Sequence, residues 1–147
     1  AVAAAALALG LTVLAARSAV APSTGVAAAG RLSSQPWTAA AVQTAQAEGR
    51  PVFVNFTADW CVTCKVNERT SLSSAAVAEA FEAANALYLV GDWTLRDDGI
   101  AAELERHGRS GVPLYLVYPA GGGAPVVLPQ LLTEGVVTAA LQTAAAP

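Results

Sequence analysis

Apolar side chains gather in four short runs that predict β-strands. Each run is rich in β-branched and aromatic residues and is bounded by turn-forming residues, a pattern typical of strands in a packed sheet. The runs cover residues 51–56, 86–93, 112–118 and 125–128. The first run is apolar at almost every position rather than at alternate positions, so we expect a central strand that is buried on both faces.

The segments between these runs carry the spacing and the capping residues of helices. The predicted helices cover residues 36–48, 62–69, 74–85, 97–107 and 133–145. Ser34 is predicted to cap the first helix. The fourth helix ends before Gly108, and its apolar residues Ile100 and Leu104 share one face.

The order of these elements predicts an α/β fold with a central mixed β-sheet flanked by helices on both faces. Strands that are connected through helices run parallel, whereas the Gly-rich turn at residues 119–123 makes the last two strands antiparallel. Cys61 and Cys64 follow directly after the central strand. They therefore lie at its carboxyl end, where α/β folds usually place their chemistry.

The start of the chain differs from the rest in composition. The whole sequence is 54% apolar and 13% charged, and the uncharged run at residues 1–16 is slightly too short to cross a bilayer as a helix of about 20 residues. We expect residues 1–17 to be the end of a transmembrane helix, residues 18–34 a flexible linker, and residues 35–147 the folded domain. A cleaved secretory signal and an Ala-rich soluble helix are the alternatives for the apolar start.

The distribution of charge argues against nucleic acid as a partner. Residues 31–147 hold seven of the eight basic residues and all eleven acidic residues, which gives this part a net charge of −4. Proteins that bind nucleic acid carry basic patches that neutralise phosphates. We therefore expect no nucleic-acid partner.

Cys61 and Cys64 are the candidate catalytic residues. At the N-terminus of a helix, unpaired backbone N–H groups stabilise a thiolate, so Cys61 is predicted to be the nucleophile. Cys64 lies one helical turn further on and is predicted to attack the mixed disulfide that Cys61 forms with a substrate. The spacing makes this second step intramolecular.

Two simpler interpretations of the cysteine pair are weaker. A structural disulfide that closes so small a loop removes little entropy from the unfolded chain. The sequence has two Cys and one His, fewer than the four ligands of a structural zinc site. We expect no metal, and no cofactor other than a redox-active Cys61–Cys64 disulfide. A binding module whose Cys pair holds copper or zinc between two chains stays as an alternative.

The residues around the pair resemble those of a known family. The segment at residues 53–65 looks like the active-site strand and helix of the thioredoxin superfamily. More closely, residues 58–65, Glu68 and residues 111–113 resemble the C-terminal thioredoxin-like domain of DsbD-type transmembrane thiol-disulfide interchange proteins. The resemblance covers about residues 35–147 and is thinner after Pro125.

The resemblance implies a thioredoxin fold and the activity of a protein-disulfide reductase. Electrons would arrive from a membrane-embedded electron-conducting domain and leave Cys61 for periplasmic thiol-disulfide proteins. The protein would lie in a bacterial inner membrane with its catalytic domain facing the periplasm, and residues 1–17 would end the last membrane span. The alternative within the same fold is an independent membrane-tethered thioredoxin, for example one that acts in cytochrome c maturation.

The resemblance also implies contacts with substrate. Pro113 corresponds to a cis proline that faces the cysteine pair in proteins of thioredoxin fold. Val112 would then offer its backbone groups to an extended substrate segment, as in strand addition. Trp60, directly before Cys61, is expected to shield the site and to contact partners.

Glu68 and Asn55 are expected to set the proton chemistry. Glu68 lies four residues after Cys64 on the predicted helix, so its carboxylate is placed to raise a thiol pKa or to take the resolving proton. The family often has a buried Asp six residues before the first Cys, where this chain has Asn55. Because an amide accepts no proton, either Glu68 or water must deprotonate Cys64, or the second step of exchange is slower.

Overall fold

The computed structural model describes residues 32–147. The predicted membrane segment at residues 1–17 and most of the predicted linker lie outside the described residues. Within residues 32–147, no helix is both long enough and apolar enough to cross a membrane.

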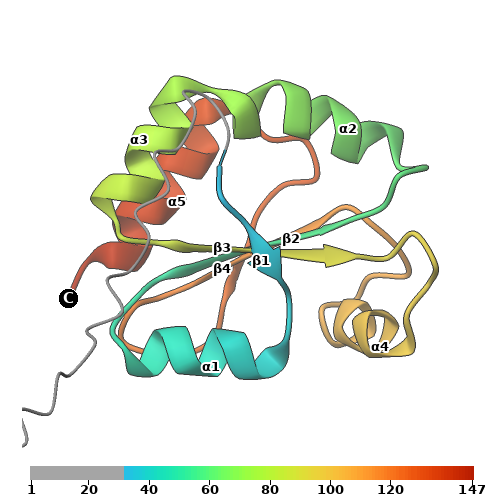
Figure 1. The fold of residues 1–147 in the computed structure, drawn as a ribbon, viewed down its shortest axis with the longest axis horizontal. Helices are drawn as coiled ribbons and strands as arrows, with labels where there is room; N and C mark the ends of the chain where they lie inside the picture. The colour runs from blue at the N-terminus through green and yellow to red at the C-terminus, as the bar shows by residue number, and fades with distance from the viewer. Residues whose placement is uncertain (1–31) are drawn as a thin grey trace, which may run out of the picture.

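A five-stranded mixed sheet forms the centre of the molecule (Figure 1). The strands span Gln35–Pro36 (β1), Val52–Thr57 (β2), Leu87–Asp92 (β3), Leu114–Tyr118 (β4) and Val126–Val127 (β5). In the order β1-β3-β2-β4-β5, the first three strands are parallel, β4 is antiparallel to β2, and β5 is antiparallel to β4. Every residue of β2 is buried, which confirms that the central strand is covered on both faces.

Helices cover both faces of this sheet. They span Ala39–Ala47 (α1), Val62–Arg69 (α2), Ala75–Ala83 (α3), Asp98–Arg106 (α4) and Glu134–Ala145 (α5), and a 3-10 turn spans Ser71–Ser73 (η1). Figure 1 shows α1 and α4 on one face and α2, α3 and α5 on the other. The predicted mixed sheet with flanking helices is therefore confirmed.

The alternation of side chains along β2 divides the core into two layers. Phe53 points to the α3 and α5 side, where its ring packs edge-on against Phe81 at a centroid distance of 5.4 Å. Phe56 points to the α1 and α4 side and packs against Trp37 at 5.0 Å. Gly91 gives Phe56 its space, because a Cβ atom there would lie 2.4 Å from the phenyl ring.

The first helix begins later than the sequence predicts. It starts at Ala39, and its N-cap is Thr38, whose hydroxyl accepts a hydrogen bond of 3.0 Å from the backbone of Ala41. The prediction of Ser34 as the cap is therefore wrong. The preceding residues form the short edge strand β1 beside β3, a position that tolerates proline because an edge leaves some N–H groups unpaired.

The third predicted strand is shorter than its apolar run. It begins at Leu114 rather than at Val112, because Pro113 has no N–H to donate to a strand ladder. The remaining boundaries agree with the prediction to within two residues, and α2 spans the predicted residues.

Candidate active site

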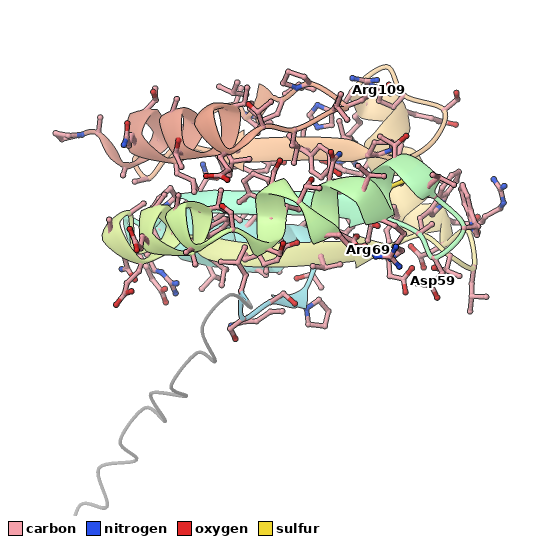
Figure 2. The ribbon with its side chains drawn as sticks, turned by 90° about the horizontal axis from the view of Figure 1, so that it is seen from above. Asp59, Arg69 and Arg109 are labelled. Carbon is pink, nitrogen blue, oxygen red and sulfur yellow. A yellow bond between two sulfur atoms is a disulfide. The ribbon has the colours of Figure 1, made fainter. Side chains whose placement is uncertain are left out.

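The two cysteines lie after β2, at the start of α2. They form a disulfide with an S–S distance of 2.06 Å and a Cα–Cα distance of 5.3 Å. Figure 2 shows this bond at the same end of the molecule as Asp59. Cys64 is fully buried, whereas Cys61 keeps 7% of its surface exposed. The sulfur that a partner can reach first is therefore that of Cys61.

Cys61 also caps helix α2. Its sulfur accepts a hydrogen bond of 3.2 Å from the backbone N–H of Cys64. In the reduced state this donor and the positive end of the helix dipole favour a thiolate on Cys61. The geometry fits the predicted division into an accessible nucleophile and a buried resolving thiol.

The loop before β4 packs against the disulfide. The Val112–Pro113 peptide bond is cis, as expected. Val112 packs against a small buried cluster that contains Ala58, Cys61 and Cys64. Within residues 32–147, the backbone N–H and carbonyl of Val112 make no hydrogen bond. These groups are therefore free to pair with an extended segment of another protein.

Trp60 lies on the surface beside Cys61 and is 48% exposed. Its indole N–H donates a hydrogen bond of 3.2 Å to the carbonyl of Thr94, and its ring lies 6.0 Å from that of Trp93. An aromatic side chain that is half exposed yet held in place provides a contact surface at a low entropic cost. The position fits the predicted role in partner contact.

The loop after β3 supports this tryptophan. The hydroxyl of Thr94 accepts a hydrogen bond of 3.0 Å from the backbone of Asp59. The same hydroxyl and the Thr94 backbone N–H both donate to the carboxylate of Asp92. These two hydrogen bonds lower the pKa of Asp92, since they stabilise the ionised carboxylate.

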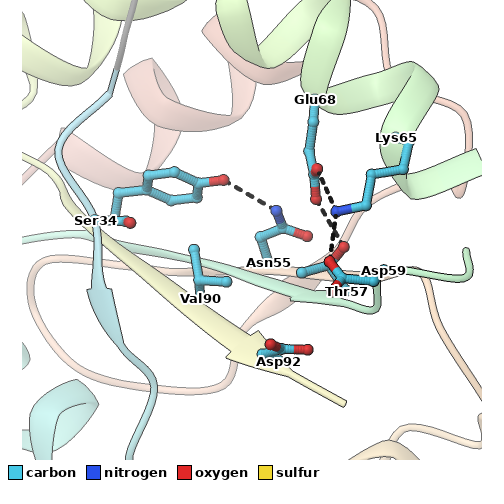
Figure 3. Close-up of a pocket in the computed structure, with 9 residues that line it drawn as sticks. Ser34, Asn55, Thr57, Asp59, Lys65, Glu68, Val90 and Asp92 are labelled. Atoms are coloured by element: carbon cyan, nitrogen blue, oxygen red, sulfur yellow. Dashed lines mark hydrogen bonds and ion pairs between the residues drawn. The ribbon is translucent and has the colours of Figure 1, made fainter. Parts of the chain in front are cut away.

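A pocket of about 290 Å³ lies between α2 and the carboxyl ends of β2 and β3. Figure 3 shows its lining, which consists of polar side chains apart from Val90. We call it the polar pocket, and its lining residues are Ser34, Asn55, Thr57, Asp59, Lys65, Glu68, Tyr88, Val90 and Asp92. The structure thus brings both predicted proton-handling residues, Asn55 and Glu68, to one place.

Glu68 is held in this pocket by two neighbours (Figure 3). Its carboxylate accepts a hydrogen bond of 2.7 Å from the hydroxyl of Thr57 and forms an ion pair of 3.0 Å with Lys65. Lys65 also lies 3.6 Å from the carboxylate of Asp59. Partial burial acts to lower the pKa of Lys65, but the two carboxylates outweigh it and the pKa is raised. A fixed ammonium therefore accompanies Glu68 at neutral pH.

Asn55 is almost fully buried at the base of the pocket, with 1% of its surface exposed. Its amide N–H donates a hydrogen bond of 3.0 Å to the hydroxyl of Tyr88, whereas its Oδ1 atom has no partner within residues 32–147. Burial raises the pKa of Tyr88 to about 12, although the hydrogen bond from Asn55 acts in the opposite direction. Both groups are therefore neutral at pH 7, and neither accepts a proton from Cys64.

A second buried asparagine, Asn67, was missed by the sequence analysis. Its amide N–H groups donate to the hydroxyl of Tyr115 at 2.8 Å and to the carbonyl of Gln130 at 2.7 Å, and its oxygen accepts from the N–H of Leu132 at 3.1 Å. These bonds fix α2 against the loop before α5. The available signal was a polar residue three positions after Cys64, on the buried face of an amphipathic helix.

The described residues show no candidate metal centre. In residues 32–147, no three His, Cys, Asp or Glu side chains are close enough together to hold a metal ion. Glu103 on α4 and His107, the C-cap of that helix, form a close pair 3.3 Å apart, but within residues 32–147 no third ligand joins them.

Comparisons with known proteins agree with this geometry. A family model described as thioredoxin-like matches residues 33–120. The thiol:disulfide interchange protein DsbD of Ralstonia nicotianae is 40% identical over 87 residues, which cover 58% of this chain and 14% of that protein. The chain therefore spans only a small part of the length of this relative.

Solved structures confirm the thioredoxin-like fold. The reduced C-terminal domain of Neisseria meningitidis DsbD matches with a TM-score of 0.57 and 22% identity, over 72% of this chain and 96% of that chain. A thioredoxin from Thermus thermophilus matches with a TM-score of 0.60 and 22% identity, over 76% of this chain and 87% of that chain. The resemblance to DsbD-type thioredoxin-like domains is thus confirmed.

Proposed function

The chain belongs to the thioredoxin-like family, and we propose that it is a protein-disulfide reductase that works through Cys61 and Cys64. The observation that carries this proposal is the position of the Cys61 sulfur. It caps α2, bonds to the buried Cys64 sulfur and lies beside the cis Val112–Pro113 peptide. This arrangement combines an activated thiol, a resolving thiol and a place for substrate backbone.

The reaction proceeds in two exchange steps from the reduced chain. First, the Cys61 thiolate attacks a sulfur of the partner's disulfide, a mixed disulfide forms, and the partner's second sulfur leaves as a thiolate. Next, the Cys64 thiolate attacks Cys61, which releases the partner's first sulfur and forms the Cys61–Cys64 disulfide. The partner gains two electrons and, after protonation, two protons.

Glu68 is the proton acceptor that this chain offers to Cys64. It lies one helical turn from Cys64, and Thr57 and Lys65 hold its carboxylate in the polar pocket. Asn55 occupies the position of the acidic residue common in the family and takes no proton. Deprotonation of Cys64 therefore depends on Glu68, directly or through water in the pocket.

The partner segment is placed by the loop before β4. Since the backbone of Val112 makes no hydrogen bond within residues 32–147, it can pair with an extended strand whose cysteine then meets Cys61. Pro113 and Trp60 border this position, Pro113 as a buried support and Trp60 as an exposed contact.

The supply of electrons is proposed from the relatives. They carry the name thiol:disulfide interchange protein DsbD, and this chain spans 14% of the first of them. On this basis the donor is a membrane electron-conducting domain, the acceptors are periplasmic thiol-disulfide proteins, and the catalytic domain faces the periplasm from a bacterial inner membrane.

The test is the reduction potential of the Cys61–Cys64 pair, measured for the 147-residue chain by equilibration with glutathione or dithiothreitol buffers. The redox state is read from alkylated thiols. A reductase requires a value between about −270 and −200 mV, whereas a value near −120 mV is that of a strong oxidant and would reverse the proposed direction.

A further inference from the structure

The loop at residues 93–97, between β3 and α4, is fixed against the residues that precede Cys61. Thr94 accepts hydrogen bonds from the backbone N–H of Asp59 at 3.0 Å and from the indole of Trp60 at 3.2 Å. Trp93 closes the loop on itself, because its indole donates to the carbonyl of Asp97 at 3.2 Å and its own carbonyl accepts from the N–H of Arg96 at 3.0 Å. These hydrogen bonds hold the loop and the residues directly before Cys61 together as one rigid unit.

Arg96 adds a second set of contacts to this loop. Its guanidinium carbon lies 4.9 Å from the ring centroid of Trp60 and 5.0 Å from that of Trp93, distances at which a cation is attracted to an aromatic ring. Its backbone has a φ of 58°, a conformation that few residues other than glycine adopt. Within residues 32–147 it forms no ion pair. Its one evident role is to hold the loop against the two indoles.

Leu95, directly before Arg96, lies in solvent. Leu95 is 94% exposed and directly follows Thr94, whose carbonyl accepts the hydrogen bond from the half-exposed Trp60. Val62, which follows Cys61, is 77% exposed. We call these three exposed side chains, Trp60, Val62 and Leu95, the apolar surface. Trp60 and Val62 flank Cys61 in the chain, and the Thr94–Trp60 hydrogen bond joins the loop that carries Leu95 to Trp60.

We propose that the 93–97 loop is a docking arm for the protein whose disulfide reacts with Cys61. Leu95 packs against apolar side chains beside the partner's cysteine, and Arg96 is the positioning residue that keeps Leu95 in place. The inference rests on the proposed function and adds a recognition element to it. The occupant is the polypeptide around an exposed protein disulfide, since the loop is hydrogen-bonded to Asp59 and Trp60, directly before the cysteine that reacts with that disulfide.

The test compares a protein disulfide with a small one. The reduced 147-residue chain is mixed with insulin or with glutathione disulfide, and its oxidation is followed by acid quenching and thiol alkylation. We expect Leu95→Ser to lower the rate constant with insulin by roughly fivefold or more, the scale of an interface residue that contributes binding energy. The rate constant with glutathione disulfide stays within about twofold, because Cys61 itself is unchanged.

Matched variants separate docking from a general loss of structure. Val126→Ser alters another exposed valine, on the edge strand β5, and leaves both rate constants unchanged. Arg96→Gln lowers the insulin rate in the same direction as Leu95→Ser, and Arg96→Lys restores part of it because an ammonium still stacks on indole.

Three outcomes overturn the docking arm. Leu95→Ser has no effect on the insulin rate, or it lowers both rates equally, or the wild-type chain forms a dimer that Leu95→Ser dissociates, which would make the loop an interface between copies. A wild-type chain that reduces neither disulfide is a different result, because it overturns the proposed function and the docking arm with it.

Discussion

The polar pocket and the apolar surface both adjoin the active-site segment and differ in what they contain. The pocket holds Glu68, Lys65 and Asn55, which are half-buried or buried and joined to neighbours by hydrogen bonds and ion pairs. The apolar surface holds Trp60 and Leu95, which point into solvent. Partly buried polar groups, such as those of the pocket, transfer protons, whereas exposed apolar groups, such as those of the apolar surface, bind proteins.

This difference indicates that chemistry and recognition are separable in this molecule. A change in the pocket should affect exchange with every disulfide, large or small, and should alter its pH dependence. A change in the apolar surface should affect exchange with proteins alone. The predictions below test this division.

The largest effect is expected from Cys61→Ser, which removes the nucleophile that the pocket and the apolar surface both serve. Exchange should fall by at least about 10³-fold with insulin and with glutathione disulfide, as is usual when a covalent nucleophile is lost. Cys64→Ser should instead retain the first step and accumulate a mixed disulfide with the partner, detected by mass spectrometry. A Cys64→Ser chain that accumulates none would show that Cys61 is not the attacking thiol.

Glu68→Gln should slow the resolving step on the order of 10²-fold at neutral pH, the scale of a lost general base. The amide keeps the size of the side chain and accepts the hydrogen bond from Thr57, so the fold should persist. The rate at which Cys64 releases a partner from Cys61 is measured by rapid quenching across a pH series. Glu79→Gln, an exposed change on α3, is the control. An unaltered pH profile would assign deprotonation to water alone.

Asn55→Asp should raise the pKa of the active-site thiols. A buried carboxylate disfavours a second negative charge nearby, and Oδ1 of Asn55 has no partner that would neutralise it within residues 32–147. The alkylation rate of Cys61 against pH measures this directly. The same substitution should restore part of the activity of Glu68→Gln, because it supplies a new proton acceptor; if it restores none, position 55 has no route to Cys64.

The smallest effect concerns stability at high pH. The pKa of Tyr88 is raised to about 12 by burial, above its value of about 10 in an unfolded chain. The unfolded state therefore loses this proton first, and stability falls between about pH 10 and 12 by up to about 1.4 kcal/mol per pH unit. Denaturant unfolding should show a shallower decline for Tyr88→Phe. Parallel curves for the two chains would mean that Tyr88 ionises as easily when folded.

Local patterns were sufficient to predict the fold and the reactive pair. The strand at β2, the Cys-x-x-Cys spacing and the start of α2 are consecutive in the sequence, so propensity and capping act together there. The predicted start of α1 was wrong because the local pattern around Pro36 fits two different structures. Pro36 fits the first turn of a helix as well as it fits an edge strand, and only the neighbouring β3 decides between them.

The supporting residues could not be predicted, because their partners are distant in the chain. Asn67 bonds to Gln130, 63 positions away, and Trp60 bonds to Thr94, 34 positions away. The sequence around Leu95 has no periodic pattern that would distinguish an exposed leucine from a core leucine. The loop that carries Leu95 is held by the stacking of Arg96 on two indoles from separate parts of the chain, which depends on the assembled fold.

The cap that the Cys61 sulfur provides for α2 links the free energy of unfolding to the reduction potential, two quantities that are usually measured separately. Oxidation, reduction, folding and unfolding form a closed thermodynamic cycle, so any free energy by which the N–H of Cys64 stabilises the reduced thiolate must also appear in the reduction potential. For a two-electron couple, about 1.4 kcal/mol corresponds to about 30 mV. Unfolding curves of the oxidised and reduced chains therefore yield the shift in potential that the fold imposes, without any redox buffer or partner protein.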